Sequence, residues 1–283
     1  MKWVSELADA LLIDRIDVEN SSPAGGVVEI WTINRTDKLN ALNSDLYAAL
    51  KSASKAADED DDVRVVIIRG ETPPVPSGDE RQKPPAFAAG ADISEFVGAN
   101  SKEIRNEFDN NAWEAIWNIS KPTIASIDGF ALGGGSEIAL SCDLRVATTR
   151  SNFGTPEINL GLIPGGGGTQ RLTRLLGYGR ALEMVMTGDM IPAHEAYRIG
   201  IVNKICEPDE LQSMTMNLAM NLASKSPHTI KVAKRAVRAA LELPMSEGVK
   251  FERDEFCALF DTEDKEIGVN AFLQREKPEW KGN

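Results

Sequence analysis

The stretch that decides the fold is KPTIASIDGFALGGGSEIAL, residues Lys121–Leu140. It begins with a run typical of a buried strand, passes through a glycine turn at residues 133–135 and continues as an apolar helical segment. Three consecutive glycines are costly in chain entropy, and the cost is explained if a backbone N–H group must approach a ligand oxygen closely. The stretch therefore predicts a strand–turn–helix unit whose turn binds a negatively charged oxygen.

Short strand-forming runs lie on either side of this stretch. Residues 27–33 and 63–68 precede it, residues 144–147 follow it, and residues 44–58 carry apolar side chains at helical spacing. Strands that alternate with helices in this way indicate a largely parallel sheet buried on both faces. The predicted fold class is α/β.

The last third of the chain has a different pattern. From about Pro192 strand-forming runs become scarce, while residues 210–224 and 227–243 have helical periodicity, and Pro244 is expected to end the second helix. We therefore divide the chain into an α/β core, residues 1–200, and a helical C-terminal subdomain, residues 201–283.

Prolines are concentrated in one segment of the core. Five of the 14 prolines lie between Glu71 and Pro85, a composition that cannot sustain a helix or a sheet ladder. The segment is predicted to be a surface loop, which either covers a ligand entrance or decorates the surface. Decoration is favoured because surface loops tolerate insertions at small cost.

Charge and cysteine content exclude several classes of protein. Lys and Arg number 31 against 43 Asp and Glu, a net charge of −12, so a nucleic-acid partner is not expected. Cys142, Cys206 and Cys257 are widely spaced and form no C-x-x-C pair, which argues against disulfides and a thiolate metal site and favours the cytoplasm. We expect no membrane association, because no run of about 20 apolar residues and no signal sequence is evident.

Common catalytic motifs do not account for the chain. No G-x-G-x-x-G follows a strand, no G-K-[ST] closes a glycine cluster, and no G-x-S-x-G is present. Only two histidines occur, His194 and His228, and His194 lacks the second histidine of a zinc helix. Acid–base chemistry therefore falls to carboxylates, without a metal.

A second loop and two glutamates complete the candidate site. Residues 87–92, FAAGAD, are small enough to supply a second backbone donor for the same oxygen. Glu137 lies in the first turn of the helix after the glycines, and Glu157 follows Pro156. Either glutamate can equally be an ordinary acidic residue at a helix N-terminus, so from the residues alone both interpretations stay open.

At this point the sequence resembles the crotonase (enoyl-CoA hydratase) superfamily. The similarity extends from residues 33–42 through residues 182–188 to the region around Phe260. Several ordered motifs together make the resemblance specific, and they are FAAGAD at 87–92, GFALGGGSE at 129–137, FGTPE at 153–157 and GLIPGGGGTQRL at 161–172.

The resemblance implies the roles of the main site residues. The oxyanion hole would be the N–H groups of Ala91 and Gly134, and the two catalytic glutamates of the family's hydratases map onto Glu137 and Glu157. One carboxylate commonly serves an isomerase, whereas water addition needs a base for the water and an acid for the α-carbon. Two glutamates therefore favour enoyl-CoA hydratase activity, the reversible syn addition of water to a trans-2-enoyl-CoA, which gives a 3-hydroxyacyl-CoA.

The resemblance also implies a binding surface and an assembly. The fold would be a crotonase-like spiral of ββα units. The chain would assemble as a homotrimer, often paired into a hexamer, and residues 251–272 of the C-terminal subdomain would form the interface. Trp113 and Trp117, spaced i, i+4, would either shorten the acyl pocket or pack as ordinary helix residues. No cofactor is expected, since coenzyme A is part of the acyl-CoA thioester substrate. The residues assigned to substrate and coenzyme A are Lys38, Leu39, Ala41, Ala89, Ala91, Asp92, Ile93, Gly134, Pro164 and Gly165.

Two further functions stay open on the sequence. The nearer is a Δ3,Δ2-enoyl-CoA isomerase or another CoA lyase or hydrolase on the same fold. The more distant is the RNA-binding role of some relatives, which requires a basic stripe that this acidic chain lacks. Short substrates such as crotonyl-CoA, or 3-hydroxypropionyl-CoA in the dehydration direction, fit the prediction.

Overall fold

The computed structural model describes residues 10–18, 25–73, 83–108 and 111–283. The middle of the proline-rich segment, residues 74–82, lies outside the described residues, so its predicted role as a surface loop is not tested. The described residues next to it, 71–73 and 83–85, form no regular element.

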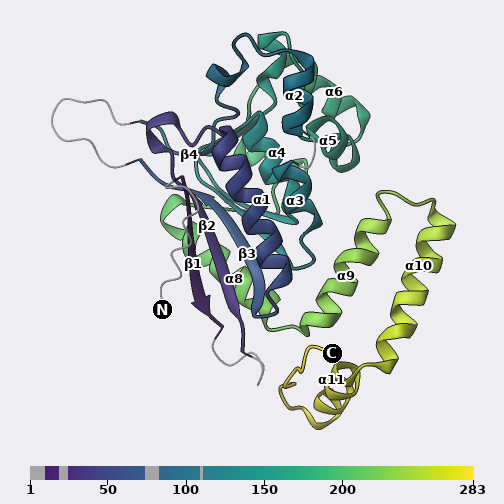
Figure 1. The fold of residues 1–283 in the computed structure, drawn as a ribbon. Helices are drawn as coiled ribbons and strands as arrows, with labels where there is room; N and C mark the ends of the chain where they lie inside the picture. The colour runs from purple at the N-terminus through teal and green to yellow at the C-terminus, as the bar shows by residue number, and fades with distance from the viewer. Residues whose placement is uncertain (1–9, 19–24, 74–82, 109–110) are drawn as a thin grey trace.

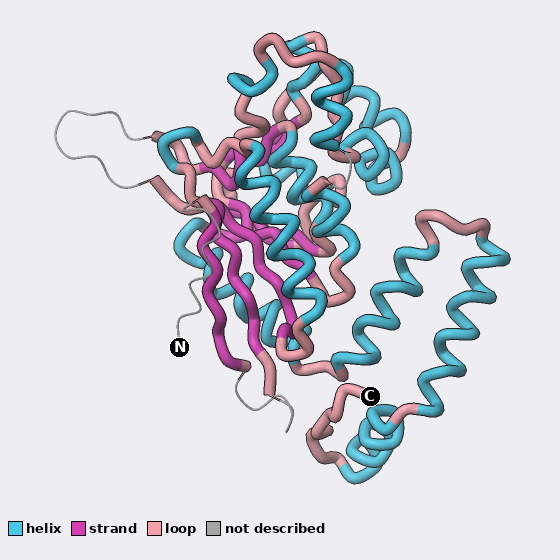
Figure 2. Tube along the Cα trace, in the orientation of Figure 1, coloured by secondary structure: helices cyan, strands magenta, loops and turns pink. Residues whose placement is uncertain are grey.

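A six-stranded sheet is the centre of the fold, with strand order β1-β2-β3-β5-β7-β10. β1 pairs antiparallel with β2, and all other neighbours pair parallel. In Figures 1 and 2 the strands lie side by side with helices around them. The strands are β1 (Leu11–Asp17), β2 (Val27–Ile33), β3 (Val63–Gly70), β5 (Thr123–Ile127), β7 (Leu144–Thr148) and β10 (Lys204–Cys206).

Both faces of this sheet are buried. In β3, Val66 and Ile68 join the larger apolar cluster, which includes α1 (Ser44–Glu59), whereas Val65 and Ile67 join a second cluster completed by α8 (Leu211–Ala223). Alternate side chains of a strand point to opposite faces, so one β-rich run serves two hydrophobic layers. The predicted α/β class and two-sided burial are confirmed.

A second, four-stranded sheet carries the glycine turn, with strand order β4-β6-β8-β9. The pairs β4–β6 and β6–β8 are parallel, and β8–β9 is antiparallel. These strands have only two or three residues each, too few for periodicity to reveal them. They are β4 (Ala86–Ala88), β6 (Phe130–Leu132), β8 (Asn152–Gly154) and β9 (Ile191–Pro192).

Helices surround the two sheets and form the C-terminal third. No helix among the described residues is long and apolar enough to cross a bilayer. The remaining helices are α2 (Ser101–Phe108), α3 (Ala112–Asn118), α4 (Gly134–Ser141), α5 (Gly168–Leu176), α6 (Tyr178–Thr187), α7 (Ala193–Arg198), α9 (Pro227–Ala239), α10 (Met245–Ala258) and α11 (Glu263–Gln274).

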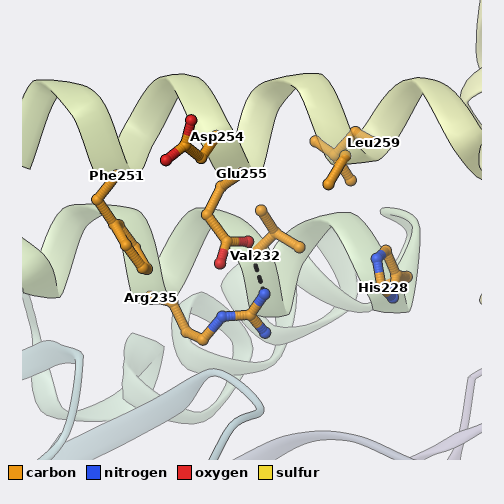
Figure 3. Close-up of a pocket in the computed structure, with 8 residues that line it drawn as sticks. His228, Val232, Arg235, Phe251, Asp254, Glu255 and Leu259 are labelled. Carbon is orange, nitrogen blue, oxygen red and sulfur yellow. Dashed lines mark hydrogen bonds and ion pairs between the residues drawn. The ribbon is translucent and has the colours of Figure 1, made fainter.

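Helices α9, α10 and α11 extend away from the sheets (Figure 1). α9 is tied to the core by Asp143, whose carboxylate accepts from Lys234 Nζ at 2.6 Å and from Arg238 Nη2 at 2.8 Å. A pocket of about 350 Å³ lies between α9 and α10, where Arg235 pairs with Glu255 at 2.6 Å (Figure 3). The division of the chain at residues 200 and 201 stays a prediction.

One predicted helix boundary is wrong. The helix at residue 227 ends at Ala239 instead of continuing to Leu243, and turns fill residues 240–243. Pro244 is the N-cap of α10, so it starts the next helix. A proline is well tolerated at a helix start, where its missing N–H group is not needed.

Candidate active site

The candidate site lies where three short parallel strands end. Ala88 of β4 pairs with Ala131 of β6, and Leu132 of β6 pairs with Gly154 of β8. The carboxyl ends of parallel strands meet at one edge of a sheet, so the loops that follow come together there. These loops carry the residues predicted for catalysis, which are Ala91, Gly134, Glu137 and Glu157.

The glycine turn is built by close backbone contacts. Gly133 has φ +51°, a conformation that side-chain-bearing residues rarely adopt, and its N–H donates to Gly154 O at 2.9 Å. A Cβ on Gly133 would lie 3.7 Å from Gly90 Cα, which places the second loop beside the turn. A Cβ on Gly135 would lie only 2.1 Å from Ala88 O. Glycine therefore lets α4 begin directly against β4.

The N–H groups of Ala91 and Gly134 are among the main-chain donors in these loops that have no internal acceptor. Ala91 forms an isolated bridge with Leu42, in which Leu42 donates to Gly90 O and accepts from the Asp92 N–H, each at 2.8 Å. In the described part of the chain, neither the Ala91 N–H nor the Gly134 N–H donates a hydrogen bond. Two free donors on adjoining loops, one of them in the first turn of a helix, can stabilise an oxyanion.

Glu137 is buried at the base of the site. Its side chain is 2% exposed, and its Oε1 accepts from the Gly168 N–H at 2.7 Å. Burial raises the pKa of Glu137 to about 7, and the negative charge of Glu157 also raises it. Three other groups lower the pKa of Glu137 and so oppose this rise: the N–H groups of Gly168 and Gly166 and the positive charge of Arg171. A carboxyl group with a pKa near neutrality can exchange protons at physiological pH.

Glu157 faces the glycine turn from the other side. It follows Pro156 at the start of a 3₁₀ helix, Pro156–Leu160, and a Cβ on Gly133 would lie 3.1 Å from its Oε1. Its Oε2 is buried and has no hydrogen-bond partner. Among the side-chain nitrogen and oxygen atoms that the structure describes, it is the only one in this situation. Burial raises the pKa of Glu157. An unpartnered buried carboxyl oxygen favours the protonated form of the group.

Comparison with known proteins identifies the family. The family model described as enoyl-CoA hydratase/isomerase matches residues 23–283. The chain belongs to the enoyl-CoA hydratase/isomerase family. The short-chain-enoyl-CoA hydratase of Clostridium acetobutylicum is 40% identical over 256 residues, which cover 90% of this chain and 94% of that protein. The resemblance predicted from the motifs is confirmed.

Further relatives extend the comparison to structure. The crotonyl-CoA hydratase of Syntrophomonas wolfei is 38% identical over 247 residues, which cover 87% of this chain and 91% of that protein. The crystal structure of an enoyl-CoA hydratase from Bacillus anthracis is 31% identical, with a TM-score of 0.85 and coverage of 97% of this chain and 100% of that chain. The α/β fold is therefore the fold of the enoyl-CoA hydratase family.

The residues expected to contact coenzyme A lie beside the Ala91 loop. Leu39 O accepts from the Ala89 N–H at 3.1 Å, and Arg35 pairs with Asp92 at 3.0 Å, so the two segments are held together. Lys38 is exposed, and Ile93 is 44% exposed. Ala41, Ala89, Ala91 and Asp92 are half-buried along the same contact. An exposed lysine beside a half-buried apolar surface suits a long ligand with phosphate groups.

The glycine-rich loop before α5 closes the base of the site. Pro164 is buried, and a Cβ on Gly168 would lie 3.0 Å from its Cβ and 2.9 Å from Glu137 Oε1. Gly165 is exposed on its outer side, but a Cβ there would lie 2.8 Å from the Phe108 ring. Pro164 and Glu137 therefore both lie close to Gly168, whereas Gly165 packs on an aromatic residue.

The two candidate tryptophans have different surroundings. Trp113 is buried, donates from Nε1 to Gly134 O at 3.1 Å, and stacks on Phe108 with ring centroids 5.5 Å apart. Trp117 instead contacts two guanidinium groups, with Arg238 at 4.0 Å and Arg171 at 5.0 Å from its ring centroid. The role of both in the acyl pocket stays a prediction, and the hydrogen bond of Trp113 places it beside Gly134.

Sequence reasoning missed several residues that build the site. Tyr47 packs against Trp113 at 4.8 Å between ring centroids, and a Cβ on Gly134 would lie 3.2 Å from its hydroxyl group. Arg171 and the Gly168 N–H, which contact the Glu137 region from α5, were also not singled out. The dense glycines at 165–168 were the available signal, because they allow the backbone to approach a side chain closely.

Proposed function

We propose that this chain is an enoyl-CoA hydratase, which adds water reversibly to the double bond of a trans-2-enoyl-CoA. Two observations support the proposal, apart from the family. Two main-chain donors and two carboxyl groups converge on one site, and the two carboxyl groups differ in their hydrogen bonding. The difference carries the assignment, because water addition needs one base and one acid.

The proposed reaction begins when the thioester carbonyl oxygen accepts hydrogen bonds from the N–H groups of Ala91 and Gly134. These donors stabilise the negative charge that develops on the oxygen, which makes C3 of the acyl chain electrophilic. Glu137 takes a proton from a water molecule, whose oxygen forms the new bond to C3. Glu157 gives its proton to C2, and dehydration uses the same groups in the opposite roles.

The hydrogen bonds favour this distribution of protons. Glu137 accepts from the Gly168 N–H, which stabilises its ionised form as a base. The Oε2 atom of Glu157 has no donor among the described residues, which favours the protonated acid. The two groups interact, since the charge of Glu157 raises the pKa of Glu137, so near neutral pH one proton belongs to the pair.

The proposal includes a short acyl chain and no separate cofactor. The aromatic cluster of Tyr47, Trp113 and Phe108 beside Gly134 is a wall close to the proposed carbonyl position, which suits acyl groups of crotonyl size. Coenzyme A enters as part of the substrate, and the four groups named above account for each proton and charge in the step. A cytoplasmic location stays a prediction.

Hydration of crotonyl-CoA is the direct test. The purified chain is expected to remove the enone absorbance of crotonyl-CoA and to form 3-hydroxybutyryl-CoA, with kcat/KM falling as the acyl chain lengthens toward ten carbons. A Δ3,Δ2-isomerase would instead generate enone absorbance from a 3-enoyl-CoA and leave crotonyl-CoA unchanged. Equal turnover of four-carbon and ten-carbon substrates would remove the short-chain assignment while leaving the hydratase.

The oligomeric state is a second prediction, which rests on the C-terminal helices. Phe256 and Phe260 are 60% and 55% exposed, and Phe272 is 83% exposed. Apolar side chains exposed to this extent on adjoining helices indicate an interface. Light scattering is expected to give three or six times the chain mass of 30.8 kDa. The Phe272→Asp variant is expected to shift the mass toward that of a monomer, and a monomeric wild-type chain would contradict the prediction.

A further inference from the structure

The Arg171 guanidinium lies beside the loop that contacts Glu137 and, like those of Arg64 and Arg145 elsewhere among the described residues, has no carboxylate partner. Arg171 is half-buried in the first turn of α5, and in the described part of the chain no carboxylate lies within ion-pair distance of it. Arg238, which also contacts the Trp117 ring, pairs with Asp143 at 2.8 Å. An unpaired and partly desolvated cation is costly unless its charge serves another group.

The contacts of Arg171 lead to Glu137 through the glycine loop. Its Nη1 donates to Gly166 O at 2.6 Å, and a Cβ on Gly167 would lie 2.2 Å from the same Nη1 atom. Two residues further along, the Gly168 N–H donates to Glu137 Oε1 at 2.7 Å. Arg171 therefore contacts the 166–168 loop through Gly166, and the same loop contacts the Glu137 carboxylate through Gly168.

Trp117 makes a second contact with the Arg171 guanidinium. The Arg171 Cζ atom lies 5.0 Å from the Trp117 ring centroid, within the range of cation–π attraction. The loop contact and the ring contact together restrict the side chain, so its charge stays near Glu137. The other charged groups that act on Arg171 are Glu114 of α3 and Arg238 of α9, and Glu157 acts on Glu137 from the opposite side.

We propose that Arg171 is a positioning residue for Glu137, which holds the Gly166–Gly168 loop against the carboxylate and keeps the pair's proton on Glu157. This inference rests on the proposed hydratase function and deepens it. Arg171 does not touch substrate in this scheme. Its charge lowers the pKa of Glu137, so its removal raises that pKa and moves the proton to the residue that must act as base.

The test is the pH profile of crotonyl-CoA hydration by the full chain. In Arg171→Met the acidic limb of the plot of kcat/KM against pH is expected to shift by about one unit toward higher pH. The loss of rate is then about tenfold near pH 6 and smaller toward pH 9. Arg171→Lys keeps the charge, so its acidic limb is expected to return toward that of the wild type, with KM for crotonyl-CoA little changed in both variants.

Arg174→Met is the matched control, one turn further along α5. Arg174 is exposed and donates to Gln170 O and Leu241 O, away from Glu137, so its removal is expected to leave the profile unchanged. A uniform loss of kcat in Arg171→Met without displacement of the limb would show a merely structural role and overturn the inference. An equal displacement in Arg171→Lys would do the same. Either result leaves the hydratase proposal intact if the wild-type chain hydrates crotonyl-CoA.

Discussion

Glu137→Gln and Glu157→Gln are each expected to reduce kcat for crotonyl-CoA hydration by about a thousandfold, within the range that a single general acid or base contributes. The amide of glutamine neither takes a proton from water nor gives one to C2, although its shape is almost unchanged. Glutamine at 137 can still accept the Gly168 N–H, so the loop geometry is preserved. Initial rates at saturating crotonyl-CoA measure the loss directly.

The pair of variants also separates hydration from its alternative on this fold. Loss of turnover in both variants requires both carboxyl groups, as water addition does. Near wild-type hydration by either variant would contradict the proposed mechanism, and a one-carboxylate reaction such as isomerisation would then be the better assignment. Glu183→Gln on α6 is a matched control, because Glu183 is exposed and lies outside the site, and it is expected to keep full activity.

Stability measurements distinguish an inactive variant from an unfolded one. The folded-state pKa of Glu137, about 7, lies above the ordinary glutamate value of 4.5, so the protonated group contributes stability below pH 4.5. That contribution is lost as the pH rises through 7, because the charge is then buried in the folded state. Glu137→Gln is therefore expected to melt at a higher temperature than the wild type at about pH 8. A lower melting temperature there would indicate damage to the fold.

The sequence was informative where the chain repeats a pattern over several residues. The strand at Val27–Ile33 and the helix from Ser44 were predicted at their observed starts, because a β-rich run and a helical spacing extend over seven or more positions. The second sheet was missed because β4, β6 and β8 have three residues each and are stabilised by pairing with distant segments. The antiparallel strand β1 was also not predicted.

The candidate site followed from glycines more than from periodicity. The turn at residues 133–135 was predicted from its entropy cost, and the contact of Gly135 with Ala88 explains that cost. Arg171 was not predicted, because its role depends on where α5 begins relative to α4. The Leu42–Ala91 bridge was likewise beyond local reasoning, since it joins segments about 50 residues apart.

Gly135→Ala is expected to impair both stability and turnover, which makes it the sharpest test of the backbone geometry. The added Cβ would lie 2.1 Å from Ala88 O and 2.7 Å from Ala88 C, so the backbone of α4 or of β4 must move. Overpacking of this kind typically costs about 1–3 kcal/mol of unfolding free energy. Because Gly134 is the preceding residue, the same movement displaces its N–H from the position opposite Ala91.

Loss of one oxyanion donor lowers kcat by about a hundredfold to a thousandfold, so the expected effect on turnover exceeds the effect on stability. Urea unfolding and kcat for crotonyl-CoA, measured on the same preparation, separate the two effects. Gly179→Ala is the matched control, because nothing lies within 4 Å of a Cβ on that exposed residue of α6. A folded Gly135→Ala protein with wild-type kcat would show that the Gly134 N–H does not depend on this contact, and the proposed oxyanion hole would lose its structural basis.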